Sequence, residues 1–327
     1  MTQTALTLVA DIGGTNTRVA LAEGTTLIPD TIERFRNAEY PGLETVLTRY
    51  LEGQGHPGCA GACVALAGPV RDGVGDMTNL DWTIDAATVA RATGTDVVDV
   101  INDLQAQGHA LDHIEEGCLT RIVPGPAPKG HASKLVIGIG TGFNCAPVHD
   151  TPAGRLVVPS EAGHANLPIR SVEELELCRD FETAHGFPAV EDVLSGRGLA
   201  HVATWMSARA GETREYSAAQ VMEAVEAGNE TARAALAFFV RIMGTVTGNL
   251  SLIHLPFGGV FLVGGVARAV SPWLIEMGFD DAMRDKGRFA GFMKNFSVTL
   301  VDDDYAALTG CARHMAQKLG ARISVSG

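Results

Sequence analysis

An apolar run that ends in a glycine turn occurs twice in this chain, and this repeat constrains the fold more than any other feature. Residues 8–15 read LVADIGGT and residues 135–142 read LVIGIGTG. Apolar and β-branched residues favour a strand, and glycine permits the tight turn that follows. Because strand-like residues resume at 18–21, the first copy predicts a β-hairpin, and the second copy predicts another. Residues 259–265, GVFLVGG, predict a third buried strand that ends in a glycine pair.

Strand-like and helix-like segments alternate along the rest of the chain, which predicts an α/β fold. The 327 residues are enough for about two domains. A second domain is expected after the loop at 124–130, where proline and glycine interrupt regular structure. The spacing of apolar residues predicts helices at 43–51, 104–111, 231–255 and 305–319, and short strands at 63–67, 97–101 and 297–301.

Charge and composition restrict the partners and the compartment. The net charge is -13 and no run of Lys and Arg occurs, so we expect no nucleic acid partner. The first residues, MTQTALTLVADIGG, lack the pattern of a secretion signal, and no apolar run reaches the roughly 20 residues of a membrane helix. The six cysteines include no Cys-x-x-Cys pair and are expected to be reduced thiols. The sequence therefore predicts a cytoplasmic protein without a membrane partner.

The glycine turn at 11–18, DIGGTNTR, is the strongest candidate for a phosphate site. No Gly-x-x-x-x-Gly-Lys-Ser/Thr motif is present, and the Gly-x-Gly-x-x-Gly pattern that starts at 138 fails at Phe143. At 11–18, glycines let backbone N–H groups approach an anion, beside hydroxyls and a carboxylate. Asp11 could hold Mg²⁺ through water, because Mg²⁺ keeps several waters and takes few protein carboxylates. The alternative is an ordinary tight hairpin.

The pair Asn102-Asp103 lies where a predicted strand gives way to a predicted helix. Functional side chains of α/β proteins are often displayed at the carboxyl ends of strands, and a carboxylate there can accept a proton. The alternative is structural, because Asn102 followed by Gln105 resembles a helix capping box.

Two further segments, one with Glu161 and His164 and the other with Glu191, are candidates for binding a polar ligand. Residues 160–164, SEAGH, display the Glu161 carboxylate and the His164 imidazole on a predicted turn, and both groups can bind sugar hydroxyls. The alternatives are a solvated turn for Glu161 and a structural role for His164. Glu191 precedes the turn Ser195-Gly-Arg-Gly and could simply favour the first turn of a helix.

The order of these segments resembles the bacterial glucokinase family, of the hexokinase and actin-like ATPase superfamily, over essentially the whole chain. Residues 11–18 and 138–142 resemble the two phosphate motifs of the family, and residues 263–266, VGGV, its adenosine motif. Asn102-Asp103 resembles its catalytic Asn-Asp pair. Residues 161–164 resemble its Glu-x-Gly-His sugar motif, Glu191 its acidic residue before Ser-Gly-x-Gly, and residues 285–289, DKGRF, a further family segment.

The resemblance implies a two-domain actin-like ATPase (ribonuclease H-like) fold with a central cleft. The small domain would comprise residues 1–113 plus 304–327, and the large domain residues 114–303. The resemblance also implies an ATP-dependent kinase that phosphorylates glucose at O6, with Asp103 as the base and a homodimer as the assembly. Asn102, Asp103, Glu161, His164 and Glu191 would bind glucose. ATP and Mg²⁺ would be bound by Asp11, Gly13, Gly14, Thr15, Asn16, Gly140, Thr141, Gly142, Gly264 and Gly265.

The chain departs from the family pattern at two places. Phe143-Asn144 stands where the family usually has Leu-Gly, and Ala162 stands where it usually has Gly, so the backbone of both turns becomes a question for the structure. Two alternative functions remain, a kinase for another hexose or amino sugar and a non-catalytic sugar sensor. The intact Asp11, Asn102-Asp103 and glycine turns argue against the sensor. ADP or polyphosphate would use anion-binding turns similar to those for ATP.

Overall fold

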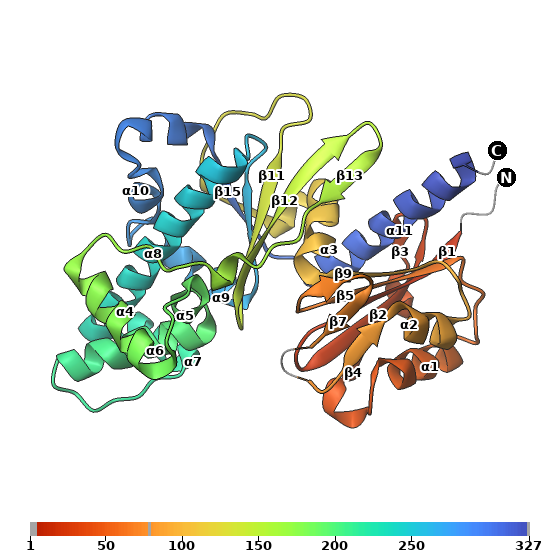
Figure 1. Ribbon diagram of the computed structural model, residues 1–327, viewed down its shortest axis with the longest axis horizontal. Coiled ribbons are helices and arrows are strands. Elements are labelled where there is room, and N and C mark those ends of the chain that lie inside the picture. Colours follow the sequence, from red (N-terminus) through yellow and green to blue (C-terminus); the bar gives the residue numbers. More distant parts are fainter. Residues whose placement is uncertain (1–4, 78–79, 326–327) are drawn as a thin grey trace. The chain divides into compact units, whose positions relative to one another are not determined.

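A computed structural model describes residues 5–77 and 80–325, and the chain divides into two compact units (Figure 1). The first unit comprises Met1–Glu115, Pro152–Pro159 and Asp303–Gly327, and the second comprises Glu116–Thr151 and Ser160–Asp302. The structure thus groups Pro152–Pro159 with the first unit, although the predicted boundaries assign this segment to the large domain.

The first unit is built on a mixed sheet with the strand order β3-β2-β1-β5-β9, and β4 also pairs with β2. The predicted first hairpin is the antiparallel pair β1–β2, and β5 and β9 run parallel to β1. A smaller antiparallel sheet has the order β6-β7-β8. The strands are β1 (Leu6–Ile12), β2 (Asn16–Glu23), β3 (Thr26–Leu27), β4 (Glu33–Arg36), β5 (Gly61–Leu66), β6 (Val70–Arg71), β7 (Val74–Asp76), β8 (Thr83–Asp85) and β9 (Val98–Asn102).

Helices cover both faces of the larger sheet in the first unit (Figure 1). Alternation along β1 sends Leu8 toward α1 (Leu43–Gly53) and α2 (Ala86–Thr93), and sends Val9 toward α3 (Asp103–Ala110) and α11 (Ala306–Val325). α11 and α3 pack closely at Gly310, where an added Cβ would lie 1.7 Å from the carbonyl oxygen of Ala106. The helix that carries Asp103 is therefore fixed against the C-terminal helix.

The second unit contains a sheet with the strand order β10-β15-β14-β11-β12. β11, β14 and β15 are parallel, whereas β12 and β10 run antiparallel to their neighbours. The pair β11–β12 is the second predicted hairpin. The strands are β10 (Leu119–Val123), β11 (Lys134–Ile139), β12 (Phe143–Thr151), β14 (Val260–Val263) and β15 (Val298–Val301).

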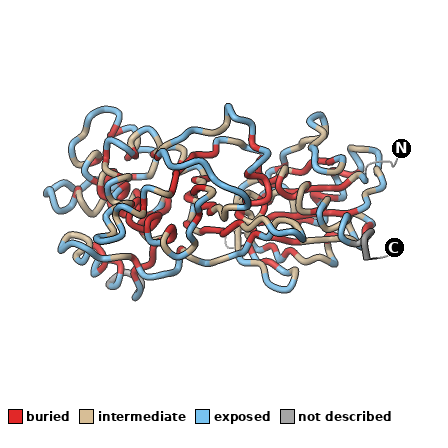
Figure 2. The backbone as a smooth tube through the Cα atoms, turned by 90° about the horizontal axis from the view of Figure 1, so that it is seen from above, coloured by how far each residue is buried: buried red, intermediate tan, exposed pale blue. Residues whose placement is uncertain are grey.

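The long helix α8 (Glu230–His254), predicted at 231–255 and labelled in Figure 1, contributes many side chains to the core of the second unit. Buried residues, red in Figure 2, form the interior of each unit. Within the described part of the chain, α8 alone is long and apolar enough to cross a membrane, yet 67% of its most apolar window is buried inside the protein. Gly244 and Gly248 let α10 (Phe279–Arg284) approach closely, because an added Cβ would lie 2.4 and 2.3 Å from backbone oxygens of Phe279 and Met283. This burial indicates a core helix.

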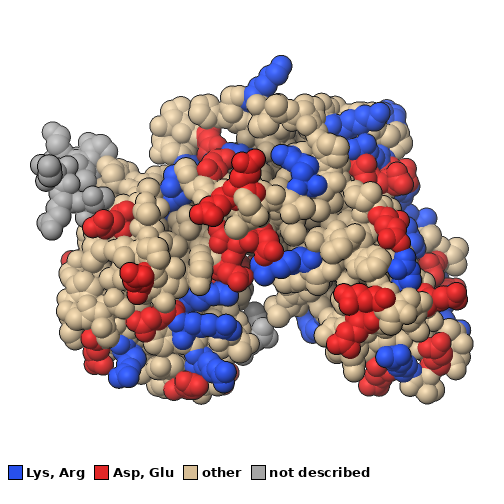
Figure 3. Space-filling view, turned by 180° about the vertical axis from the view of Figure 1, so that it is seen from behind, with Lys and Arg blue, Asp and Glu red and all other residues tan. Residues whose placement is uncertain are grey.

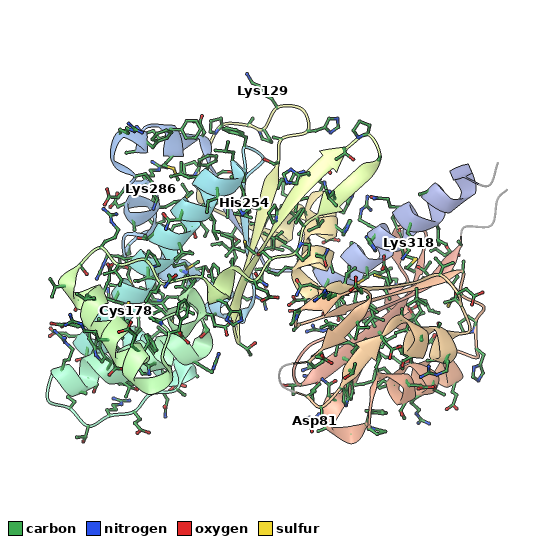
Figure 4. All side chains as sticks on the ribbon, viewed as in Figure 1. Asp81, Lys129, Cys178, His254, Lys286 and Lys318 are labelled. Carbon is green, nitrogen blue, oxygen red and sulfur yellow. The ribbon has the colours of Figure 1, made fainter. Side chains whose placement is uncertain are left out.

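The DKGRF segment follows α10 and supports α8. Lys286, labelled in Figure 4, donates hydrogen bonds to the carbonyl oxygen of Thr245 at 3.0 Å and to Oδ1 of Asn249 at 2.9 Å. Burial lowers the pKa of Lys286, with the Arg170 charge adding to the effect. In the described structure, this family segment therefore packs against α8.

The remaining helices complete the two units. Lys and Arg are interspersed with Asp and Glu on the face shown in Figure 3, and the six cysteines are free thiols. The remaining α-helices are α4 (Val172–His185), α5 (Val190–Val193), α6 (Gly196–Arg209), α7 (Ala218–Glu226) and α9 (Gly265–Val270). The 3-10 helices are Pro29–Thr31, Asn37–Glu39, Leu111–His113, Glu116–Cys118, Ala162–His164, Ser271–Trp273, Gly287–Phe289 and Phe292–Asn295.

Candidate active site

The parallel strands of the first unit end at one edge of the sheet, and the predicted residues of that unit follow them. Ile12 of β1 is in register with Leu66 of β5, and Leu66 is in register with Asn102 of β9. The carboxyl edge of a parallel sheet is where α/β proteins bind ligands. The structure therefore brings together, at this edge, Asp11, Gly13, Gly14, Thr15, Asn16, Asn102 and Asp103.

The first glycine turn is braced by a residue that the sequence did not single out. Gly13 N–H donates to the carbonyl oxygen of Asn16 at 3.0 Å and closes the turn. Asn37, only 1% exposed, donates from Nδ2 to the Gly13 carbonyl oxygen at 2.8 Å, and its Oδ1 accepts a hydrogen bond from the Thr17 hydroxyl at 2.8 Å. Asn37 N–H also donates to the carbonyl oxygen of Thr15 at 3.0 Å. This bracing preorganises the turn.

Asp11 lies at the end of β1 and pairs with Arg18 across the hairpin. The Arg18 Nη1 to Asp11 Oδ2 distance is 3.3 Å, and the carboxylate side chain is 16% exposed. Burial raises the pKa of Asp11, and the positive charge of Arg18 opposes this increase. A partly buried carboxylate beside an open glycine turn is suited to a hydrated cation that also contacts phosphate.

Asn102 forms the predicted capping box at the start of α3. Its Oδ1 accepts the Leu104 N–H at 2.9 Å, and the Asn102 N–H donates to Oε1 of Gln105 at 3.1 Å. Nδ2 of Asn102 donates to the carbonyl oxygen of Gly68 at 3.0 Å. The capping interpretation is confirmed, and it fixes the position of the neighbouring Asp103, which is the first residue of the helix.

Asp103 is partly buried and has an unusual ionisation equilibrium. Its Oδ1 accepts the Leu104 N–H at 2.9 Å. Burial, followed by repulsion from the Asp11 carboxylate, raises the pKa of Asp103 to about 7, and its hydrogen bonds only partly offset this increase. A carboxylate with a pKa near neutrality is suited to general base catalysis, because it is ionised yet still basic at pH 7.

The second glycine turn lies at the carboxyl ends of β11 and β14. Gly140 N–H donates to the carbonyl oxygen of Gly142 at 2.9 Å. Gly264, which follows β14, has a φ of 102°, and an added Cβ would lie 2.4 Å from the Ile139 carbonyl oxygen. Glycine is therefore required at 264, where the backbone turns into α9. This edge holds Gly140, Thr141, Gly142, Gly264 and Gly265.

Glu191 connects the second glycine turn with the 160–164 loop. Its Oε2 accepts the Phe143 N–H at 3.1 Å, and its Oε1 lies 3.3 Å from Nη2 of Arg197. An added Cβ at Gly142 would lie 2.3 Å from Oε2 of Glu191, and one at Gly163 would lie 2.1 Å from the Phe143 carbonyl oxygen. Glu191 is in the first turn of α5, as its structural alternative predicted, and it also packs beside the glycine turn.

The 160–164 loop, which carries Glu161 and His164, is held by Asn144. Oδ1 of Asn144 accepts the Ala162 N–H at 3.1 Å, and Nδ2 donates to the Ser160 carbonyl oxygen. Glu161 and His164 are both exposed. Burial raises the pKa of Glu161, with His164 opposing and Glu191 adding to the increase.

The two departures from the family pattern do not disturb these turns. Phe143 and Asn144 begin β12 in register with Ile139 and Gly138, and neither they nor Ala162 has a positive φ. Ala162 therefore fits its 3-10 turn without strain, and Asn144 provides a side chain that glycine would lack.

The comparison with known proteins decides the family. A glucokinase family model matches residues 8–318. The chain belongs to the glucokinase family. The glucokinase of Saccharophagus degradans is 31% identical over 316 residues, which cover 95% of this chain and 98% of the relative. The glucokinase of Chromohalobacter salexigens is 33% identical over 304 residues, which cover 93% and 95%.

Solved glucokinase structures share the fold. A glucokinase from an Antarctic psychrotroph has a TM-score of 0.83 and 30% identity, covering 95% of this chain and 98% of that chain. A glucokinase from Balamuthia mandrillaris, in complex with glucose, has a TM-score of 0.80 and 20% identity, covering 96% and 94%. A Streptomyces griseus glucokinase of the ROK family, in complex with glucose and AMPPNP, has a TM-score of 0.64 and 20% identity, covering 96% and 99%. The predicted glucokinase family, its kinase activity and the two-domain actin-like ATPase fold are confirmed.

Proposed function

We propose that this glucokinase family member transfers the γ-phosphoryl group of ATP to O6 of glucose, with Asp103 as the general base. The observation that carries this proposal is the Asp103 carboxylate at the carboxyl end of β9, with a pKa raised to about 7 by burial and by Asp11. In the proposed step, Asp103 accepts the O6 proton, the O6–phosphorus bond forms, and the bond from phosphorus to the bridging oxygen breaks to release ADP.

The two glycine turns would bind the nucleotide. Their backbone N–H groups can approach phosphate oxygens because no Cβ blocks them, and the Gly264-Gly265 turn would bind adenosine. Among the described residues, no group of three or more His, Cys, Asp or Glu side chains could hold a metal ion. Asp11 provides a single carboxylate beside the first glycine turn. One carboxylate fits Mg²⁺, which takes few protein ligands and would complete its coordination with phosphate oxygens and water. When bound, Mg²⁺ would neutralise charge on the phosphates.

The sugar would be bound by groups that retain hydrogen-bonding capacity. Asn102 uses one N–H of its amide on Gly68 and keeps a second. Each carboxylate oxygen of Glu191 has one protein partner, which leaves room for a hydroxyl. Glu161 and His164 are exposed and can reach a ligand. We assign these four side chains to the hydroxyls of glucose.

The names and complexes of the relatives support the choice of glucose and ATP. The two relatives reported above are named glucokinases, and the Streptomyces griseus neighbour was solved with glucose and AMPPNP. A cytoplasmic homodimer remains our expectation for the assembly, and sedimentation velocity would test it.

A coupled assay across sugars tests the proposal. Purified protein with Mg-ATP is assayed against glucose, mannose, fructose, galactose and N-acetylglucosamine, with ADP and sugar phosphate measured together. The proposal predicts the highest kcat/KM with glucose. Preference for another sugar would identify a different hexose or amino sugar kinase, and glucose binding without turnover would identify a sensor.

A further inference from the structure

Gln105 forms a bridge between the start of the catalytic helix and a segment distant in sequence. Its Oε1 accepts the backbone N–H of Asn102 at 3.1 Å, and its Nε2 donates to the carbonyl oxygen of Val157 at 3.0 Å. Val157 is only 3% exposed, so its carbonyl group has little access to water as a substitute. One side chain thus connects the residue before Asp103 with β13 (Gly154–Val157).

The 152–159 segment lies along α3 and is held there by several further contacts. Nη1 of Arg155 donates to the Gly108 carbonyl oxygen at 3.2 Å, and Nη2 pairs with Asp112. Arg155 N–H donates to Oε1 of Gln317 at 2.9 Å, and Nε2 of Gln317 donates back to the Arg155 carbonyl oxygen at 3.2 Å. The segment is therefore fixed near both ends of α3, with Gln105 providing the contact nearest to Asp103.

The same segment leads directly into the loop that carries Glu161. Only Val158 and Pro159 separate Val157 from Ser160, whose carbonyl oxygen accepts a hydrogen bond from Asn144. The carbonyl groups of Val157 and Ser160 both accept side-chain hydrogen bonds, from Gln105 and Asn144. Of the two residues between them, one is proline, whose φ is fixed. The chain on the C-terminal side of Val157 is therefore also restrained.

We propose that Gln105 is a positioning residue that holds the Asn102-Asp103 cap in place by tying it to the 152–159 segment of the same unit. This proposal rests on the proposed roles of Asp103 as base and Asn102 as a sugar ligand. Loss of the bridge removes this support from the cap, so the Asn102 amide and the Asp103 carboxylate lose their alignment with the sugar. A misplacement of about 1 Å can lower the rate of a reaction about 100-fold.

A set of three variants tests this role. Gln105→Met removes both hydrogen bonds while keeping the length of the side chain. Gln107→Met is the matched control, because Gln107 lies on the same helix and its buried Oε1 has no partner in the described structure. Gln105→Glu keeps the acceptor for Asn102 N–H, loses the donor to Val157, and adds a negative charge beside Asp103.

We expect Gln105→Met to lower kcat/KM for glucose about tenfold or more, through both a lower kcat and a higher glucose KM. The KM for ATP should change less than twofold, because the two hydrogen bonds of the Gln105 side chain described above are made to Asn102 and Val157. Gln107→Met should retain both parameters. In Gln105→Glu, the acid limb of kcat/KM should shift to higher pH, because the added carboxylate disfavours ionisation of Asp103.

If Gln105 only stabilised the start of α3, its removal would lower stability and leave the kinetic parameters unchanged. Gln105→Met with a lower thermal midpoint but unchanged kcat and glucose KM would overturn the proposal. If Gln105→Met does not fold, Gln105→Glu provides the test. An unchanged glucose KM together with an unshifted acid limb of the kcat/KM profile in Gln105→Glu would also overturn the proposal. Asp103→Asn separates the two claims. An active Asp103→Asn contradicts the proposed function, whereas an inactive Asp103→Asn beside a fully active Gln105→Met contradicts only the positioning role.

Discussion

Replacing Asp103 by Asn should slow catalysis strongly and stabilise the fold at neutral and alkaline pH. The pKa of Asp103 is raised from 3.8 to about 7 in the folded protein. A carboxyl group with a raised pKa contributes stability that is fully present below pH 3.8 and is lost as the pH rises to about 7. Above pH 7 the native state therefore carries an unfavourable charge, which Asn removes.

The size of this effect follows from the pKa. An increase of about 3 pH units corresponds to about 4 kcal/mol at about 1.4 kcal/mol per unit. Asp103 is only partly buried, so solvent screening reduces the gain that we expect from Asp103→Asn at pH 8 to about 1–3 kcal/mol. Loss of the base should lower kcat about 10²- to 10⁴-fold.

Denaturant unfolding at pH 8 and pH 4, together with a coupled assay, measures both effects. The stability difference should be largest at pH 8 and close to zero at pH 4. Asp85→Asn is the control of opposite sign, because hydrogen bonds from the Thr88 backbone hold the pKa of Asp85 below its usual value. It should not stabilise the protein at pH 8, and it should leave kcat unchanged. An Asp103→Asn protein that is less stable at pH 8, or that retains kcat, would refute the reasoning.

Three further predictions follow from the same geometry. The kcat/KM for glucose should fall tenfold per pH unit below about pH 7, because Asp103 must be ionised, and a flat profile from pH 5 to 8 would contradict this. Glu191→Gln should raise the glucose KM about 10- to 100-fold through a lost charged hydrogen bond, and an unchanged KM in steady-state kinetics would remove Glu191 from the sugar site. Gly264→Ala should destabilise the protein by about 1–3 kcal/mol and raise the KM for ATP, because φ is 102° and the Cβ would meet Ile139. Gly265→Ala is the control for stability, because nothing lies within 4 Å of a Cβ added at Gly265. Equal thermal midpoints for Gly264→Ala and Gly265→Ala would contradict the predicted strain at residue 264.

Local signals in the sequence were enough to predict the strands and turns that carry the candidate site. The turns at Gly13 and Gly140 follow apolar strands, and these strands pair as predicted hairpins. Asn102 followed by Gln105 predicted the capping box, because capping depends on residues three positions apart. Each of these features is determined within a short window of the chain.

Features that depend on distant contacts could not be predicted in this way. The return of residues 152–159 to the first unit depends on Arg155 and Gln105, which meet partners about 50 positions away. Asn37 gives no local signal, since its role appears only when β4 pairs with β2 and brings it to Gly13. Asn144 stands where the family usually has glycine, and the hydrogen bonds by which its side chain holds the 160–164 loop appear only in the folded chain.

The central claim is that the chain transfers a phosphoryl group from ATP to O6 of glucose. ³¹P NMR of a reaction with Mg-ATP and glucose, recorded together with ADP release, tests this claim most directly. We expect glucose 6-phosphate and ADP to form in equal amounts. ADP release accompanied by inorganic phosphate alone, or bound glucose that is never phosphorylated, would contradict it.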